Sequence, residues 1–293
     1  MIKDFTETKD FLCIYHGKCA DGFTGAWVIN KWAKQNGHSV EFHPGVYGES
    51  YPSVNNRHVI IVDFSYDRET MIKMSRFSAS ITVLDHHKSA EANMVNLEHL
   101  MYCPSEIIFD MERSGCEIAW DYFFSGKNPP QVLEHIADRD LWTFKKMNTK
   151  KISSSVFAYE YTFKNWDYLM HSQNYTTLCN DGEAIERKHH KDMLELYEGT
   201  LVWRDIEVNG KLHVVPTFNV AYFHSSELGN HAMKTLHGYV PFALCWYIGS
   251  SGEYKYSLRS IDGREDVSEI AKAFGGGGHR NSSGCSSKEP IWI

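Results

Sequence analysis

The 293-residue sequence lacks several features, and each absence excludes a class of protein. No apolar run approaches the roughly 20 residues that span a bilayer, so we expect no membrane-spanning helix. The chain begins MIKDFTETKD, which is too polar for a secretory signal peptide, and we therefore expect a soluble cytoplasmic protein. Lys and Arg number 30 against 37 Asp and Glu, a formal charge of −7, which argues against a long basic groove for duplex nucleic acid.

Paired cysteines are also missing. The chain has seven cysteines, an odd number without a C-x-x-C pair, which argues against a disulfide framework or a structural zinc site. Apolar residues make up 42% of the chain and charged residues 23%, so it can bury a substantial core. The unusual count is 16 histidines, a first indication of metal or phosphate chemistry.

The first half of the chain alternates short apolar runs with amphipathic stretches. The runs predict strands at Phe11–Tyr15, Val40–His43, His58–Val62 and Ser80–Leu84. The stretches predict helices at Gly22–Lys34, Ser114–Phe124 and Pro129–Asp138. Continuous apolar runs separated by helices are typical of a parallel sheet buried on both faces, so this half predicts a doubly wound α/β domain.

The second half has a different pattern. A charged helical stretch at Asp181–Tyr197 indicates a linker, in which His189 and His190 lie on a solvated face. Two hairpin patterns follow, the first with Asn-Gly at its turn, and then a short helix at Asp266–Phe274. We therefore predict a domain over 1–180, a linker helix over 181–199, and a smaller α+β domain with a mostly antiparallel sheet over 200–293.

Acidic and histidine residues follow the predicted strands. His16 and Asp21 follow the first strand, Asp63 the third, and the triplet Asp85, His86 and His87 the fourth, while Asp138 or Asp140 ends a later helix. Parallel strands bring such residues to one edge of the sheet, where ligands bind. Carboxylates gathered there repel one another, and one or two divalent cations would neutralise them.

Each residue alone has a simpler interpretation. A single Asp after a strand, such as Asp63, commonly caps a turn or a helix, and a single histidine such as His16 commonly lies in a core. The glycines at 275–278 alone could form a flexible loop, yet His279 and Arg280 follow directly, which favours backbone approaching an anion.

Five short motifs, in order along both halves, resemble the DHH phosphoesterase superfamily with a C-terminal DHHA1 domain. They are Y-H-G-K-C-A-D-G (15–22), V-D-F-S (62–65), D-H-H-K (85–88), A-D-R-D (137–140) and G-G-G-G-H-R-N-S-S-G (275–284). The resemblance implies a Rossmann-like catalytic domain and a substrate-binding DHHA1 domain. It also implies two divalent metal ions, most often Mn²⁺ with Mg²⁺ or Co²⁺ as alternatives, that hydrolyse phosphate esters or anhydrides.

The resemblance also assigns roles to residues. His16 and Asp63 would hold one metal, and Asp63 would bridge to a second metal held by Asp21, His86 and Asp138, with Asp140 as the alternative to Asp138. Asp85 would orient the neighbouring imidazole, and His87 would face the scissile phosphate. The residues implied in substrate binding are His87, Arg259, Gly276, Gly277, Gly278, His279 and Arg280.

One departure concerns the first motif. Many members have Asp-x-Asp there, whereas this chain has Cys19, Ala20 and Asp21. Cys19 would then ligate as a thiolate, line the wall, or leave its place to a water.

The expected activity is hydrolysis, by a metal-activated hydroxide, of phosphodiester or phosphomonoester bonds in short nucleotide substrates such as oligoribonucleotides, dinucleotides or 3′-phosphonucleotides. Trp142 is a candidate for stacking on a base, with a place in the core as its simpler interpretation. A pyrophosphatase or polyphosphatase is the alternative, and a nucleotide-binding regulatory module with a decayed metal centre is a second alternative. The resemblance further suggests a homodimer.

Overall fold

The structure is a computed structural model that describes residues 11–236 and 240–293. The chain divides into two compact units, Met1–Glu186 and Arg187–Ile293, and the division falls inside a long helix, α8 (Tyr175–Thr200). The predicted linker at 181–199 lies within this helix, which begins six residues earlier than the predicted linker. In the described part of the chain, no helix combines the length and apolar character that crossing a membrane requires.

The first unit is built on a five-stranded sheet with the order β2-β1-β3-β4-β5. All four pairings are parallel, which confirms the predicted doubly wound α/β architecture. The strands are β1 (Phe11–His16), β2 (Val40–Gly45), β3 (His58–Val62), β4 (Ser80–Asp85) and β5 (Ser105–Phe109). The sequence did not predict β5, because its run SEIIF is short and carries a charge.

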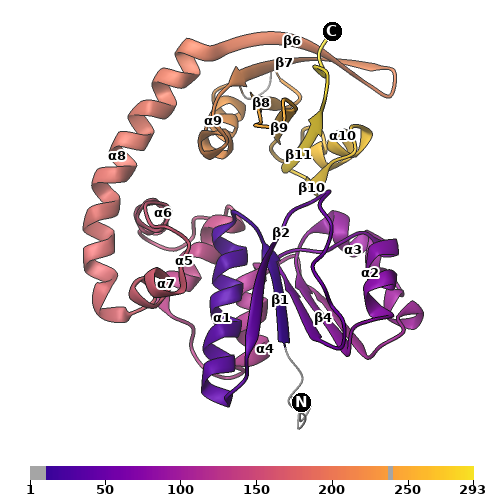
Figure 1. Ribbon diagram of the computed structural model, residues 1–293. Coiled ribbons are helices and arrows are strands. Elements are labelled where there is room, and N and C mark those ends of the chain that lie inside the picture. Colours follow the sequence, from indigo (N-terminus) through magenta and orange to yellow (C-terminus); the bar gives the residue numbers. More distant parts are fainter. Residues whose placement is uncertain (1–10, 237–239) are drawn as a thin grey trace. The chain divides into compact units, whose positions relative to one another are not determined.

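Helices cover both faces of this sheet, as Figure 1 shows. They are α1 (Ala20–Asn36), α2 (Arg68–Ser75), α3 (Lys88–Met94), α4 (Gly115–Phe123), α5 (Gln131–Asp140), α6 (Thr149–Phe157) and α7 (Phe163–Leu169), with short 3-10 turns at Leu97–Leu100 and Ser172–Asn174. Alternate residues of β1 point to opposite faces: Cys13 packs in the core with α1 and α4, whereas Ile14 packs in the core with α2. Both cores hold the carboxyl ends of β1, β3 and β4 in fixed positions.

The second unit contains a six-stranded sheet with the order β10-β11-β9-β8-β7-β6. Its strands are β6 (Leu201–Val208), β7 (Lys211–Asn219), β8 (Ala243–Ile248), β9 (Tyr254–Arg259), β10 (Gly277–His279) and β11 (Ser282–Ser287). Both predicted hairpins are present as antiparallel pairs, β6 with β7 and β8 with β9. The pairing of β7 with β8 is parallel, so the sheet is mixed.

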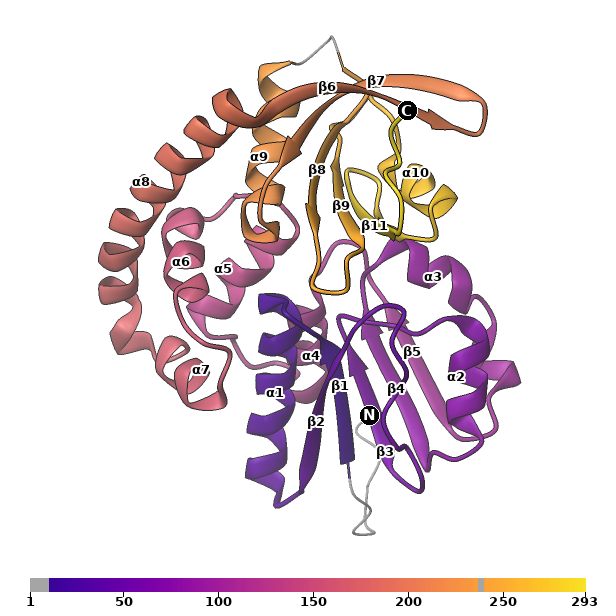
Figure 2. The same ribbon diagram turned by 45° about the horizontal axis from the view of Figure 1, so that its top comes forward.

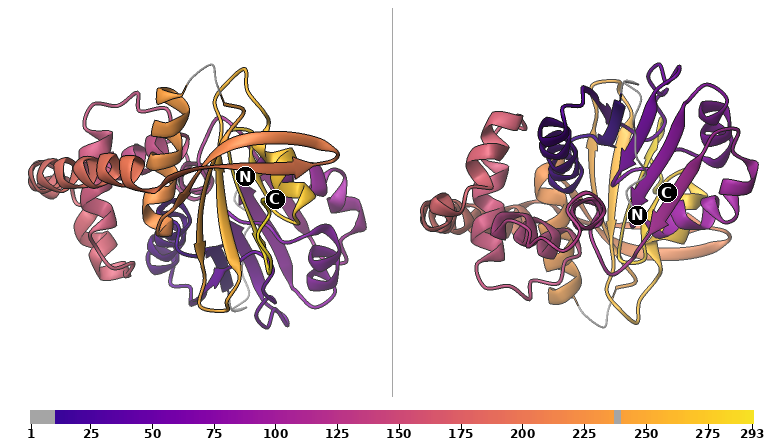
Figure 3. Two further views of the ribbon diagram at one scale, coloured as in Figure 1. Left: turned by 90° about the horizontal axis from the view of Figure 1, so that it is seen from above. Right: turned by 90° about the horizontal axis from the view of Figure 1, so that it is seen from below.

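Two helices pack on this second sheet, α9 (Tyr222–Thr235) and α10 (Val267–Ala273). Figure 2 shows α9 lying along β8 and β9, and the left view of Figure 3 shows α10 on the other side of the sheet. Each helix closes its own apolar core, to which α9 contributes the buried Leu228 and α10 the buried Ile270. The mixed sheet with a helix on each face confirms the predicted α+β class of this half.

Candidate active site

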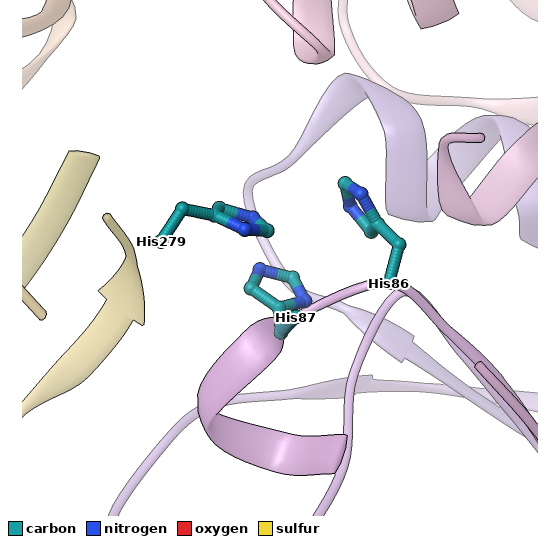
Figure 4. Close-up of side chains that lie close together, drawn as sticks. All are labelled: His86, His87 and His279. Carbon is teal, nitrogen blue, oxygen red and sulfur yellow. The ribbon is translucent and has the colours of Figure 1, made fainter. Parts of the chain in front are cut away.

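The carboxyl ends of three neighbouring strands carry the residues that the sequence singled out. His16 is the last residue of β1, Asp63 directly follows β3, and Asp85 is the last residue of β4. His86 and His87 occupy the turn from β4 into α3, and Figure 4 shows both rings. The chain order of these strands changes direction between β1 and β3, the position where open α/β sheets bind ligands.

Asp63 lies at the centre of this group. Its side chain is 1% exposed, and it accepts hydrogen bonds from Nδ1 of His16 at 3.3 Å and from Nε2 of His86 at 3.1 Å. Burial raises the pKa of the Asp63 carboxyl, but the two histidines outweigh burial and hold it well below its usual range. The Asp63 backbone has a φ of 54°, in the left-handed region that Asp tolerates better than most residues.

Two sets of three side chains that include Asp63 could each hold a cation. The first set is His16, Asp63 and His87, and the second is Asp21, Asp63 and His86. Within each set, one ligand atom from each residue lies within 4.8 Å of the others. This arrangement is compatible with two cations that share one carboxylate.

Carboxylates crowd the second set. Asp140 Oδ2 lies 3.3 Å from His86 Nε2, and Asp21 is 1% exposed. Burial and then the charges of Asp63 and Asp140 raise the pKa of the Asp21 carboxyl well above its usual range. Burial lowers the pKa of the His86 imidazole, yet Asp63, Asp140 and Asp21 outweigh it and raise that pKa to about 10. A protonated His86 offsets only part of this negative charge, so a cation would be favourable here.

The structure places Asp140, not Asp138, beside this group. The Asp138 carboxylate accepts hydrogen bonds from the hydroxyls of Thr143 and Thr149 and from the backbone N–H groups of Lys145 (2.8 Å) and Lys146 (3.0 Å). Burial raises the pKa of Asp138, but these hydrogen bonds outweigh burial and lower it. The preference for Asp138 as a ligand is therefore corrected: its oxygens stabilise the loop after α5.

Asp85 has a different partner from the expected one. Its Oδ1 accepts from Nδ1 of His87 at 2.7 Å and from the backbone N–H of His86 at 2.8 Å, and its Oδ2 accepts from the hydroxyl of Ser65 at 2.6 Å. The carboxylate therefore orients the ring of His87, and it accepts a hydrogen bond from the backbone of His86. Burial lowers the pKa of His87, but the charge of Asp85 outweighs it and raises that pKa.

The surroundings of Cys19 and Trp142 do not favour the roles considered for them, metal ligation by Cys19 and stacking on a base by Trp142. In the described residues, Cys19 is in neither of the sets with metal-ligand spacing that contain Asp63. Burial and then Asp63, Asp140 and Asp21 raise the pKa of the Cys19 thiol well above its usual range. The guanidinium of Arg139 lies 4.5 Å from the centre of the Trp142 ring and covers one of its faces. That face is therefore not open to a base.

Sequence reasoning missed the first turn of α4. The backbone N–H of Cys116 donates to both oxygens of Asp21, at 3.2 and 3.3 Å. A Cβ on Gly115 would lie 2.5 Å from Cβ of Asp63 and 2.9 Å from Oδ2 of Asp21, so only glycine fits. The signal in the sequence is a glycine directly after a capping serine, Ser114, but nothing local connects it with distant carboxylates.

In the second unit, Arg259 of β9 and His279 of β10 both pair with Ser282 of β11. Directly opposed residues share a face of a sheet, so these two basic side chains leave the same face. Nη2 of Arg259 donates to the hydroxyl of Ser226 in α9 at 2.7 Å, which holds the guanidinium against that helix. His189, expected on a solvated face of α8, instead has its Nε2 2.7 Å from Oε2 of Glu227 in α9.

The glycine-rich segment has a structural role that its sequence did not show. A Cβ on Gly276 would lie 2.1 Å from the carbonyl oxygen of Gly284, and one on Gly278 would lie 2.7 Å from that of Ser282. These two glycines allow the segment to approach β11, in which Gly284 pairs with Gly277. The Arg280 guanidinium donates to the carbonyl of Arg264 at 3.0 Å, so binding of an anion by Arg280 stays a prediction.

Comparisons with known proteins agree with the motifs. No protein-family model matches the chain. Protein R106 of Acanthamoeba polyphaga mimivirus is 32% identical over 295 residues, a match that covers 96% of this chain and 68% of R106. Oligoribonuclease NrnB of Bacillus subtilis (strain 168) is 39% identical over 258 residues, which covers 80% of this chain but only 60% of NrnB.

A solved structure shares the fold. RecJ from Thermus thermophilus, crystallised in complex with Mn²⁺, matches with a TM-score of 0.53 and 11% identity, over 95% of this chain and 49% of RecJ. The motifs, the similarity to R106 over nearly the whole chain and this fold lead to one conclusion. The chain belongs to the DHH phosphoesterase superfamily with a C-terminal DHHA1 domain.

Proposed function

We propose that the chain is a divalent-metal-dependent phosphoesterase that hydrolyses phosphodiester or phosphomonoester bonds of short nucleotide substrates. Oligoribonucleotides, dinucleotides and 3′-phosphonucleotides are the substrates we would test first. The observation that carries the proposal is Asp63, which is shared by two sets of cation-ligating side chains at the carboxyl edge of a parallel sheet. The similarity to an oligoribonuclease over 80% of the chain supports the choice of nucleotide substrates.

The ligands suit a pair of divalent cations. The donors are carboxylate oxygens and imidazole nitrogens, a mixed set that Mn²⁺ accepts and that we prefer to Mg²⁺ or Co²⁺ for this reason. His16 and Asp63 would contact one ion, and Asp21, Asp63, His86 and Asp140 the other, while His87 would face the phosphate. When bound, such cations supply Lewis acidity at the phosphate and lower the pKa of water at the site.

His87 would stabilise negative charge on the phosphate during hydrolysis. His87 keeps a proton on Nδ1, which donates to Asp85, and its raised pKa favours the imidazolium form. A positive charge held in place here would oppose the negative charge that grows on phosphate oxygens during hydrolysis. The hydroxyl of Ser65 fixes the second oxygen of Asp85, so the His87 ring is bonded to an acceptor that is itself held in place.

A hydrolysis panel with added Mn²⁺ tests the proposed function. The panel contains a linear dinucleotide, a cyclic dinucleotide, 3′-phosphoadenosine 5′-phosphate, pyrophosphate and polyphosphate. We expect turnover of at least one nucleotide, faster than either inorganic substrate, and loss of turnover after dialysis against EDTA. Faster hydrolysis of pyrophosphate than of every nucleotide would reverse the choice of substrate class. Tightly bound metal without any turnover would instead support a regulatory binding module.

A further inference from the structure

Tyr47 is an exposed aromatic residue beside the candidate metal ligands. It lies two residues after the end of β2, and 53% of its surface is open to solvent. An exposed tyrosine ring offers an apolar face together with a polar hydroxyl, which suits it to contact a ligand. Neither the motifs of the sequence nor the sets of cation ligands include Tyr47.

The ring of Tyr47 has a fixed place relative to the site. It packs on the fully buried ring of Phe64, with the ring centres 4.6 Å apart. The His16 ring meets it edge-on at 5.7 Å, and the His87 ring meets it edge-on at 6.4 Å. Only the Tyr47 ring would therefore separate a flat molecule on its exposed part from His16 and His87, which belong to the first set of candidate cation ligands.

The backbone around Tyr47 is also held in place. The N–H of Gly17, next to His16, donates to the carbonyl of Gly45 at 2.9 Å. The N–H of Glu49 closes a turn on the carbonyl of Val46 at 3.1 Å, and Gly48 supplies the positive φ of 84° that the turn requires. Because the loop is tied to the end of β1, a ligand on Tyr47 loses little free energy to ordering the loop.

We propose that Tyr47 stacks on a nucleobase of the substrate, next to the phosphate that is cleaved. The inference rests on the proposed function, and it specifies the substrate as a nucleoside-bearing phosphate rather than an inorganic one. Every base has a π-face, so a single tyrosine ring accepts any base. Tyr47 would therefore distinguish substrates that carry a base from those that do not, without preferring one base. Pyrophosphate and polyphosphate would gain nothing from Tyr47.

The test compares substrates with and without a base. A 5′-phosphorylated diadenylate and the two analogues in which one adenine is removed are hydrolysed with Mn²⁺ by wild type, Tyr47→Ala, Tyr47→Phe and Tyr47→Trp. Loss of the platform in Tyr47→Ala should raise KM for diadenylate by about 5- to 150-fold, with a much smaller change in kcat. Tyr47→Phe and Tyr47→Trp keep an aromatic face and should behave like wild type.

The analogue that lacks the stacked base should be hydrolysed equally by wild type and Tyr47→Ala. Tyr102→Ala is the matched control, because Tyr102 is 66% exposed and contacts Arg76, directly after α2, instead of the site. An unchanged KM in Tyr47→Ala would overturn the proposal. An equal fall in kcat on all three substrates would also overturn it, because Tyr47 would then only support His16.

A binding measurement separates this inference from the proposed function. If wild type hydrolyses no diester, calorimetry with Mn²⁺ compares the binding of adenosine 5′-phosphate and ribose 5-phosphate. Stacking predicts tighter binding of adenosine 5′-phosphate to wild type, and loss of that difference in Tyr47→Ala. Equal affinities in wild type would contradict stacking by Tyr47, whatever reaction the site performs.

Discussion

At the scale of single residues, Asp138 and Asp140 show how two nearby carboxylates receive different tasks. Both lie in the last turn of α5, but Asp138 is 5% exposed and satisfied by the loop that follows, whereas Asp140 contacts His86. Residues two apart on a helix point in different directions, so only one of the pair can face the site. The loop after α5 and the first residue of α6 bond Asp138, which leaves Asp140 to face His86. Nothing local in the sequence shows this choice.

Asn substitutions separate the two roles. Asp138→Asn replaces an acceptor by a donor facing buried donors, and we expect it to lower the free energy of unfolding by about 1–3 kcal/mol. Asp140→Asn should leave this free energy nearly unchanged but weaken Mn²⁺ binding. Chemical denaturation and Mn²⁺ titration of both variants distinguish the two effects. Weaker Mn²⁺ binding in Asp138→Asn alone would restore Asp138 as the ligand.

The stabilising effect of Asp138 should depend on pH. The pKa of Asp138 in the folded state is lowered, so its contribution to stability is present above the pKa of the unfolded chain, about 3.9. That contribution is lost as the pH falls through the lower pKa of the folded state. The difference in unfolding free energy between wild type and Asp138→Asn should therefore shrink below about pH 4. A difference that grows on acidification would contradict the assignment.

Asp85 should affect catalysis more than metal content. Asp85→Asn keeps one acceptor oxygen for the His87 Nδ1–H, but it removes the charge that raises the His87 pKa. We expect kcat to fall by about 10- to 100-fold while the number of bound ions is unchanged. Elemental analysis alongside steady-state kinetics makes the comparison. Loss of both ions in Asp85→Asn would show that Asp85 is itself a ligand.

At the scale of elements, the strands that deliver the site were predictable and the helix that supports it was not. Continuous apolar runs ending in Asp or His identified β1, β3 and β4, because strands buried on both faces need such runs. The contact of α4 with Asp21 joins residues 95 positions apart. Local sequence carries no information about that contact, nor about the parallel pairing of β7 with β8.

Gly115→Ala tests the support by α4. The added methyl group would meet Asp63 and Asp21, and moving them apart should cost about 1–3 kcal/mol of stability and weaken Mn²⁺ binding. Gly199→Ala in α8 is the control, because a Cβ there meets nothing within 4 Å. Calorimetric Mn²⁺ titration and thermal unfolding report on both variants. Wild-type affinity for Mn²⁺ in Gly115→Ala would contradict the prediction that a close approach of α4 to Asp63 and Asp21 is needed for binding.

At the scale of the whole molecule, each unit contributes a different part of the chemistry that the family motifs imply. The first unit holds the candidate cation ligands, and the second presents Arg259 and His279 from one row of its mixed sheet. The sequence motifs identified both parts through their residues. They could not show that Gly276 and Gly278 are required by strand pairing, because that pairing depends on a neighbour formed later in the chain.

The account depends on Asp63 being shared by two cations, and counting bound ions tests this most directly. Protein dialysed against EDTA is titrated with Mn²⁺, and bound Mn²⁺ is measured by electron paramagnetic resonance for wild type and Asp63→Asn. We predict two ions per chain in wild type with magnetic coupling between them, and weakened binding of both in Asp63→Asn. Two ions bound with wild-type affinity by Asp63→Asn would contradict the shared carboxylate and the mechanism built on it.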